Sequence, residues 1–480
     1  MVEAFAVGAC ADLGLFDPGA KDHGVGRFAK TSARVVDWLV LMEDRQPDFF
    51  HGWRGYDPAA EVPLNRHGPR SDRWTERDLK GLVASLKAEG IRPYLGYWIH
   101  ECRWVDEEEP GLLMRDARGE TWQNLALRNA DFNPLKRLKD GRPYAAFAAD
   151  RWRGLAAAFG FDGLFLGDGA MGFRQHGHDL RGLTTFDYSD AWLAEFAASA
   201  NAVPHEGCLL GDERASVPDR ARDVQTRHWR EWIAFNVRRW TDFYGEMAAA
   251  VHATGGRLAA YNVMNYDPAM ALVHGIDYRA LAGAGLDHLV FQSYDYAWGP
   301  NGPFGFLNMT RKDLATNARA FLATRAALGH QTKTRLSYTT ETSDSVEHWA
   351  APIAHTIGEV HAMGGARSFD GTRWRPAADE TFVVWANDVP EAHWRALARA
   401  WRESVRGAEP EGPVLVWRER DHEALVDEAP ILADVEALYA PLDRLPTLEG
   451  EDAAAVPGGI VLERDVAKLA PRLRAGARRG

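Results

Sequence analysis

The sequence has few cysteines and no long apolar run. Both absences limit the classes of protein to which it can belong. Only three cysteines occur in 480 residues, Cys10, Cys102 and Cys208. They are odd in number and far apart, so neither a disulfide framework nor a CxxC metal motif can be recognised. A reducing, cytoplasmic location is expected. The N-terminal stretch MVEAFAVGACADLGLF lacks a basic segment and is too short an apolar run for a signal peptide or membrane span, so we expect it to form the first strand of the fold.

Positive charge is scarce relative to negative charge. The chain has 56 Lys and Arg against 68 Asp and Glu, which gives a formal net charge of −12. Nucleic acids and anionic membranes are bound chiefly through Lys and Arg, so we expect neither as a partner. In contrast, 18 Trp residues are many for this length, and aromatic faces stack on flat ligands as well as filling cores. A neutral ligand such as a carbohydrate is expected.

Eight short apolar runs alternate with longer stretches of helical periodicity in the first 385 residues. The apolar runs span residues 5–13, 48–53, 92–101, 162–169, 257–266, 288–296, 334–344 and 365–371. The helical stretches span residues 27–43, 75–90, 144–159, 189–200, 227–254, 276–283, 311–328 and 345–363. Alternation of strand and helix is typical of parallel βα units. Eight units predict an α/β fold, a (β/α)8 TIM barrel, over residues 1–385.

The rest of the chain, residues 386–480, does not continue the alternation of strands and helices. A helix in WRALARAWRESVRG and strands in GPVLVWR and GGIVLERD, joined by connections rich in Pro, Glu and Ala, predict a small C-terminal α/β domain without recognisable chemistry. An exposed face of this domain could support a homodimer. Within the barrel, EGCLLGDERAS (206–216) could form a ninth strand, but we assign it to a long loop on the ligand side.

The stretch FDGLFLGDGAMGF (161–173) carries the clearest chemical signal. Its apolar residues suit a buried strand, yet the run ends on Asp168 between two glycines. Reactive side chains in α/β barrels come from the carboxyl ends of the strands. The flanking glycines let a substrate approach the backbone. We therefore predict that Asp168 faces a substrate cavity.

Two further acids could work with Asp168. Asp295, in FQSYDYAWG, follows a strand and stands among aromatic residues that could raise the pKa of a carboxyl group. Glu341, in SYTTETSD, follows the next strand. A pair of carboxylates across a pocket is what glycoside hydrolysis requires, because one protonates the leaving oxygen while the other attacks the sugar or activates water. The choice between Asp295 and Glu341 stays open.

Many other polar and aromatic residues follow the predicted strands, and we expect them to bind substrate. They are Asp12, His51, Trp53, Trp98, His100, Glu101, Asn262, Asn265, Gln292, Tyr294, Trp298, Asp370 and Trp374.

No metal or other cofactor is expected. His176 and His178 lie beside Asp179, but metal-dependent barrel hydrolases usually carry His-x-His after the first strand, where this chain reads GACADLG. Cys102 beside His100 could suggest a thiol nucleophile, yet no third group is in place to orient the base. No nucleophile elbow, P-loop or dinucleotide fingerprint follows a strand.

With these residues in view, the first 385 residues resemble TIM-barrel glycoside hydrolases, the broad set that includes α-galactosidases, α-amylases and dextranases. Their nucleophilic Asp ends strand four, where this chain has FDGLFLGDG. The resemblance implies that Asp168 is the nucleophile and Asp295 the acid/base. Glycosidases similar to β-galactosidases place the acid/base on strand four and a Glu nucleophile on strand seven, which would make Asp168 the acid and Glu341 the nucleophile.

The leading hypothesis is a metal-independent, retaining glycosidase that acts on an oligosaccharide or glycoside. Two alternatives remain open. The first is a carbohydrate-binding barrel without catalysis, and the second is a metal-dependent barrel lyase or isomerase.

Overall fold

The computed structural model describes most of the chain up to residue 405. The described residues are 6–42, 50, 61–63, 71–73, 76–97, 103–121, 132–167, 170, 187–199, 208–212, 214–262, 268–292, 314–340, 353–370 and 374–405.

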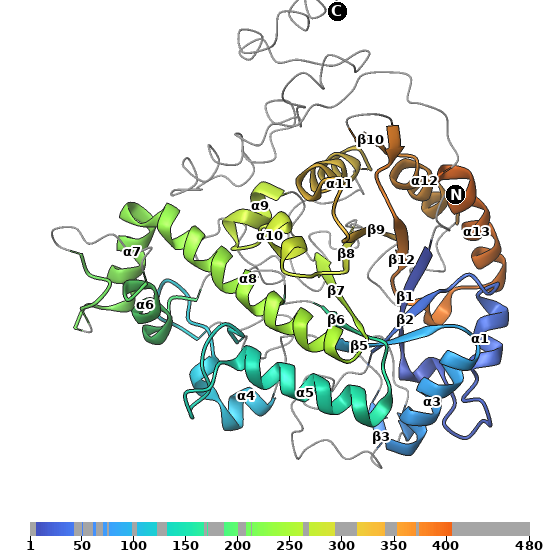
Figure 1. The fold of residues 1–480 in the computed structure, drawn as a ribbon, viewed down its shortest axis with the longest axis horizontal. Helices are drawn as coiled ribbons and strands as arrows, with labels where there is room; N and C mark the ends of the chain where they lie inside the picture. The colour runs from blue at the N-terminus through green and yellow to red at the C-terminus, as the bar shows by residue number, and fades with distance from the viewer. Residues whose placement is uncertain are drawn as a thin grey trace, which may run out of the picture.

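Eight parallel strands form a closed barrel (Figure 1). In order around the barrel they are β1 (Ala6–Asp12), β2 (Trp38–Met42), β5 (Arg92–Tyr97), β6 (Gly163–Leu166), β7 (Arg257–Asn262), β8 (His288–Phe291), β9 (Arg335–Thr340) and β12 (Glu380–Val383). β12 pairs with β1 and closes the ring. The predicted (β/α)8 TIM barrel is confirmed.

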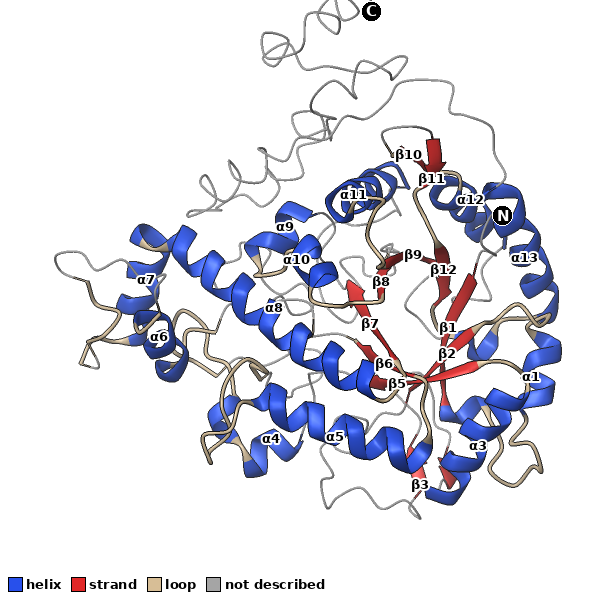
Figure 2. Cartoon of the chain, in the orientation of Figure 1, coloured by secondary structure: helices blue, strands red, loops and turns tan. Residues whose placement is uncertain are grey.

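The helices surround the strands, as Figure 2 shows by colour. They are α1 (Val25–Thr31), α3 (Glu76–Ala88), α4 (Arg103–Glu108), α5 (Tyr144–Phe159), α6 (Asp190–Ala197), α7 (Val217–Arg227), α8 (Trp229–Ala253), α9 (Pro268–Val273), α10 (Tyr278–Gly283), α11 (Leu314–Leu328), α12 (Ile353–Gly364) and α13 (Glu391–Val405). Short 3-10 turns occur at Leu13–Leu15, Pro110–Leu112 and Ala386–Asp388. Two small antiparallel hairpins join β3 (Glu61–Pro63) to β4 (Ser71–Arg73) and β10 (Arg367–Phe369) to β11 (Trp374–Pro376).

The second barrel strand is not where the sequence analysis placed it. β2 lies inside residues 27–43, which were predicted to be helical. The run predicted instead, 48–53, has one described residue, Phe50, which is helical and stacks on Tyr97 with ring centroids 4.1 Å apart. The apolar run WLVLM has no alternation, because a barrel strand is covered on both faces, and periodicity cannot separate such a run from a buried helix.

The eighth barrel strand also differs from the prediction. Residues 365–371 contain β10, which pairs with β11 in a hairpin outside the barrel, and β12 closes the ring. The hairpin connects the end of α12 to the start of β12. It therefore lies at the amino end of the barrel, opposite the end where the strands of such folds carry their reactive residues.

An aspartate precedes every second strand around the barrel. These residues are Asp37, Asp162, Asp287 and Asp379, before β2, β6, β8 and β12. The Oδ2 atom of Asp287 accepts a hydrogen bond of 2.8 Å from the backbone N–H of Leu258 on the neighbouring strand. Asp37 and Asp379 accept equivalent backbone bonds of 2.7 and 2.8 Å. Three of these carboxylates thus satisfy backbone donors at the amino edge of the barrel.

Large side chains fill the inside of the barrel. Trp38, Phe165, Tyr261 and Phe382 belong to one buried cluster, and the rings of Phe165 and Phe382 stack with centroids 5.4 Å apart. Gly8 makes room for Trp38, because a Cβ atom at this position would collide with the indole ring. With the inside filled by these side chains, the barrel leaves no room for a ligand at their level.

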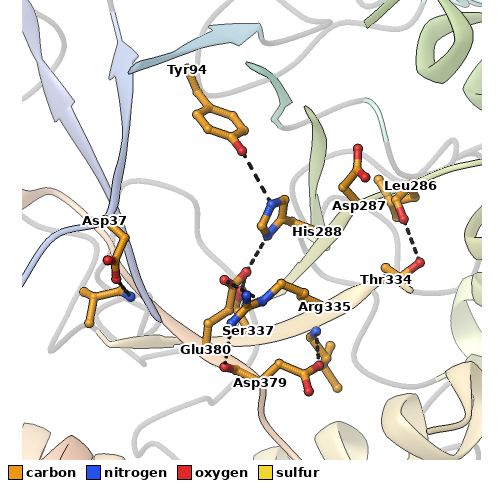
Figure 3. A network of polar contacts seen from close by, with 12 residues as sticks. Asp37, Tyr94, Leu286, Asp287, His288, Thr334, Arg335, Ser337, Asp379 and Glu380 are labelled. Carbon is orange, nitrogen blue, oxygen red and sulfur yellow. Dashed lines mark hydrogen bonds and ion pairs between the residues drawn. The ribbon is translucent and has the colours of Figure 1, made fainter. Parts of the chain in front are cut away.

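A buried carboxylate joins several strands at the amino end (Figure 3). Glu380 is fully buried, and its Oε1 accepts hydrogen bonds of 2.6 Å from His288 Nδ1 and 2.8 Å from Ser337 Oγ. Arg335 Nε lies 3.2 Å from Oε2. The contact between Arg335 and Glu380 is an ion pair without hydrogen-bond alignment, since neither atom has a hydrogen-bond partner among the described residues. Tyr94 extends the network, with its hydroxyl 3.4 Å from His288 Nε2.

The surroundings of Glu380 keep it ionised. Burial raises the pKa of this carboxyl, but the charges of His288 and Arg335 and the hydrogen bonds from His288 and Ser337 outweigh burial and bring it down to about 2. A buried carboxylate is stable only when its partners are in place. The network therefore favours one arrangement of the four strands that supply its residues.

The longest predicted helix is confirmed, and so is the helix after the barrel. α8 lies within the stretch 227–254 that was predicted to be helical. It buries one face, as its three-to-four-residue spacing of apolar side chains indicates. α13 packs against α12. Arg367, at the start of β10, also donates from Nη2 to the carbonyl oxygen of Ser404 in α13 at 2.8 Å. The described part of residues 386–480 thus covers the barrel. The remainder of the predicted C-terminal domain lies outside the described residues, so the division at 385 stays a prediction.

Replacing Glu380 by Gln should strongly destabilise the fold, because the change removes the negative charge that the fully buried His288 and the partly buried Arg335 face. We expect a loss of about 3–5 kcal/mol in the free energy of unfolding, measured by denaturant titration. The control is Glu391→Gln on α13, which removes an exposed ion pair with Arg395 and should cost at most about 0.5 kcal/mol. Equal losses in the two variants would contradict a structural role for the network.

Acid should unfold the protein partly through Glu380. The pKa of this carboxyl is about 2 in the folded protein, below its ordinary value of 4.5, so its contribution is complete above pH 4.5 and is lost as the pH falls toward 2. The unfolding free energy of Glu380→Gln should fall less steeply between pH 4.5 and 2, by on the order of 3 kcal/mol over the window. Parallel pH profiles of the variant and the unchanged protein would show that Glu380 does not contribute.

Candidate functional site

The carboxyl end of the barrel is the candidate site, and only part of it is described. Of the predicted site residues, the structure describes Asp12, Asn262, Gln292, Asp370 and Trp374. The others lie outside the described residues: Asp168, Asp295, Glu341, His51, Trp53, Trp98, His100, Glu101, Asn265, Tyr294 and Trp298. His176, His178 and Asp179, considered as a metal site, also lie outside.

Each of the three predicted acids comes shortly after a described barrel strand in the sequence. Backbone pairing of β6 continues one residue past its end, because Gly167 N–H donates to the carbonyl oxygen of Tyr97 on β5 at 2.8 Å. Asp168 is the next residue in the sequence. Glu341 comes directly after β9, and Asp295 comes four residues after β8. In barrel order these are strands four, seven and six, as the sequence analysis expected.

Asp12 faces the inside of the barrel at the carboxyl end of β1. Along a strand, alternate side chains share a face, and Asp12 lies two residues after Cys10, which belongs to the inner cluster. The Oδ2 atom of Asp12 accepts a hydrogen bond of 2.6 Å from Asn387 Nδ2, while Asp12 N–H donates to Asn387 Oδ1 at 3.0 Å. This reciprocal pair orients a buried carboxylate at the rim.

Trp385 stands beside this pair in an unusual backbone conformation. Its φ and ψ angles are 54° and 64°, in the left-handed region that residues other than glycine rarely adopt. The side chain is half-buried and packs against the inner cluster. Such strained conformations concentrate at functional sites, where the surrounding structure holds them. Trp385 and Asn387 were not among the predicted site residues, because the strand that precedes them, β12, was not predicted.

Gln292 follows β8 and shares the inner face of that strand with Val290, two residues earlier. Its side chain is half-buried, but the Oε1 atom is fully buried and has no hydrogen-bond partner among the described residues. Buried polar atoms are nearly always hydrogen-bonded. An unpartnered amide oxygen at the open end of the barrel suits a group that receives a hydrogen bond from a ligand.

Asn262 is directed away from the inside of the barrel. Tyr261 belongs to the inner cluster, so the next residue on β7 points to the opposite face. Asn262 Nδ2 donates a hydrogen bond of 2.6 Å to the hydroxyl of Tyr278 at the start of α10, in the outer core. The structure thus separates Asn262 from Asp12 and Gln292.

Asp370 and Trp374 lie at the opposite end of the barrel. They were placed at the carboxyl end because residues 365–371 were predicted to be a barrel strand, and that strand prediction is wrong. Asp370 forms an ion pair with Arg375 in the hairpin of β10 and β11. Nearby, burial lowers the pKa of His330 to about 4, and its Nε2 lies 2.6 Å from Ser368 Oγ. These contacts fix the hairpin to the loop before β9.

Comparison with known proteins identifies the fold. No protein-family model and no curated protein matches this chain. Among solved structures, the chain is similar to the β-galactosidase of the psychrophilic Marinomonas ef1, with a TM-score of 0.51 and 13% identity, over 88% of this chain and 61% of that one.

The chain is also similar to two further solved structures, with lower TM-scores. The PgaB (BpsB) glycoside hydrolase domain of Bordetella bronchiseptica has a TM-score of 0.46 and 14% identity, over 90% of this chain and 99% of that one. The class V chitinase of Pseudomonas fluorescens Pf-5 has a TM-score of 0.40 and 13% identity, over 83% and 99%.

The expected resemblance to TIM-barrel glycoside hydrolases is confirmed at the level of the fold, by the closed barrel and its likeness to the β-galactosidase. The chain spans 61% of that β-galactosidase. Within its described part, none of the helices has the length and apolar character needed to cross a membrane.

Replacing Gln292 by Met should leave the fold at least as stable, because it removes a buried amide oxygen that has no partner. We expect a change between zero and a gain of about 1 kcal/mol in the free energy of unfolding. The matched control is Gln225→Met, since Gln225 Nε2 donates to the buried Tyr188 hydroxyl at 3.3 Å, and this variant should lose about 1 kcal/mol. If Gln292→Met loses as much as Gln225→Met, Gln292 has a structural partner.

Proposed function

We propose that this protein is a glycoside hydrolase that binds its substrate at the carboxyl end of the barrel. The observation that carries the proposal is the set of polar groups above a filled barrel: the oriented carboxylate of Asp12 and the unpartnered oxygen of Gln292. Sugars present many hydroxyl groups, and such groups recognise them by hydrogen bonding. The likeness to a β-galactosidase shows only the fold, which hosts many functions.

Trp385 and Asn387 extend this binding surface. The strained backbone of Trp385 holds its indole beside the rim, where an aromatic face can stack on the apolar face of a sugar ring. Asn387 holds Asp12, so that the carboxylate of Asp12 keeps one orientation. In this proposal Asp12 accepts hydrogen bonds from substrate hydroxyls, and Gln292 does the same through Oε1.

Asp168 and one second acid carry the reaction. In a retaining mechanism, the nucleophilic carboxylate forms a bond to the anomeric carbon while the acid gives its proton to the leaving oxygen, and the glycosidic bond breaks. The second carboxylate then removes a proton from water, which attacks the anomeric carbon and releases the nucleophile. Carboxyl groups about 5–5.5 Å apart fit this mechanism, and about 6.5–9.5 Å fit inversion.

Two role assignments are compatible with the strand order. In the first, Asp168 after strand four is the nucleophile and Asp295 after strand six is the acid/base. In the second, Asp168 is the acid/base and Glu341 after strand seven is the nucleophile. We favour the first, which follows the α-galactosidase-like arrangement, and propose a neutral oligosaccharide or glycoside as the substrate.

Asp168→Asn should lower kcat on an activated aryl glycoside by at least about 10³-fold, because the amide can neither attack nor transfer a proton. The unfolding free energy should be nearly unchanged. A screen of aryl glycosides supplies the substrate for this assay. Full activity of Asp168→Asn on the substrate identified would contradict the assignment. Absence of hydrolysis together with saturable sugar binding would favour a carbohydrate-binding barrel.

Azide should distinguish the roles of the acids in variants that lack a carboxylate. If Asp168 is the nucleophile, azide added to Asp168→Gly yields a glycosyl azide of inverted configuration. If Asp168 is the acid/base, the product keeps the configuration of the substrate. The same assay on Asp295→Gly and Glu341→Gly identifies the partner by the opposite product. Activity that disappears on exhaustive chelation while the protein remains folded would instead favour a metal-dependent lyase or isomerase.

A further inference from the structure

Three side chains with metal-binding chemistry converge in the long connection between β6 and α8. Cys208 lies in a turn before α7, Asp223 lies in α7, and His228 joins α7 to α8. Their possible ligand atoms all lie within 4.8 Å of one another. The Cys208 Sγ atom is 3.7 Å from His228 Nε2, which is 4.0 Å from Asp223 Oδ2.

The surrounding backbone fixes these residues. The backbone of His228 takes part in both helices, since its N–H donates to Val224 and its carbonyl accepts from Trp232. Asp223 Oδ2 also accepts a hydrogen bond of 2.9 Å from the N–H of Leu209, next to Cys208. The side chains of Asp223 and His228 are 4% and 2% exposed. A hydrogen bond to a ligating carboxylate is the usual way of orienting a metal ligand.

The arrangement differs from a catalytic triad. In a triad, the acid binds one imidazole nitrogen and the nucleophile faces the other. Here Cys208 Sγ and Asp223 Oδ2 both approach Nε2 of His228. Because both approach the same ring nitrogen, the three donor atoms surround one point, which is what a cation requires.

We propose that Cys208, Asp223 and His228 bind one divalent cation of the zinc class. A point equidistant from the three atoms lies roughly 2.0–2.5 Å from each, given their separations, against about 2.0–2.3 Å for zinc bonded to N, O and S. Thiolate and imidazole ligands favour zinc over calcium or magnesium. Binding releases the thiol proton of Cys208 to solvent, so thiolate and carboxylate neutralise the ion.

The proposed ion has a structural role. α6 and α7 project from the barrel beside the first half of α8 (Figure 1), and the three ligands connect the turn at residues 208–212 to the junction of α7 and α8. Arg227 Nη1 lies 3.7 Å from Oδ1 of Asp223, the other oxygen of this carboxylate, and Arg227 is half-exposed. The inference is independent of the proposed glycosidase activity.

Zinc titration of the full-length, chelator-treated protein tests this proposal. We expect one equivalent of Zn²⁺ per chain in competition with a chromophoric chelator, and a melting temperature that rises with the zinc concentration. Cobalt in place of zinc should give a thiolate-to-cobalt charge-transfer band. Cys208→Ala should remove the band and weaken zinc binding at least about 100-fold, while Asp223→Asn should weaken binding and keep the band. The control Cys102→Ala should change neither.

A second measurement needs no variant. Zinc should slow the alkylation of Cys208 in the unchanged protein, as followed by mass spectrometry of the peptide that contains it. The proposal is overturned if the protein shows no saturable zinc binding, if zinc leaves the alkylation rate unchanged, or if Cys208→Ala keeps both the affinity and the cobalt band. Loss of the band in Cys102→Ala would equally overturn it.

Discussion

A carboxylate sealed inside a closed barrel requires partners, and Glu380 finds them on neighbouring strands. His288, Ser337 and Arg335 reach it from β8 and β9. The ring of Trp38 lies tilted against that of His288, with centroids 5.1 Å apart. A polar network thus occupies the amino end of the barrel and aromatic rings fill its middle. At the carboxyl end, the residues at or just after the ends of β1, β8 and β12 differ in chemistry from the rings inside the barrel. They are the oriented acid Asp12, the amide of Gln292 and the strained Trp385.

Much of this fold could be predicted because strand and helix signals alternate along the chain. Two strands were misplaced. The apolar run of β2, WLVLM, carries no alternation because both of its faces are buried, and β12, ETFV, is short and half polar, so no apolar run marks it. The sequence does hold a better signal. DWLVL, DGLFL, DHLVF and DETFV each place an aspartate one residue before a strand of alternate position. That repeat marks both β2 and β12, and in three of the four cases the aspartate accepts a hydrogen bond from the backbone of the adjoining strand at the amino edge.

The candidate site was only partly predictable. Asp12 and Gln292 could be named because they end strands, and their inward orientation follows from the residues two positions earlier. Asn262 was assigned to the cavity without regard to this parity, although Tyr261 occupies the inner face. Trp385 and Asn387 depended on a strand that was misplaced. Cys208, Asp223 and His228 converge only through the packing of a turn against two helices, which no spacing in the sequence indicates.

The pairing of β1 with β12 has a consequence for synthesis of the chain. β1 leaves the ribosome more than 360 residues before its partner β12. Until then one edge of β1 exposes hydrogen-bonding groups that could pair with other chains. The reciprocal bonds between Asp12 and Asn387 form in the same late step. Completion of the rim therefore coincides with ring closure, and a nascent chain cannot orient Asp12 in this way before its last barrel strand has been translated.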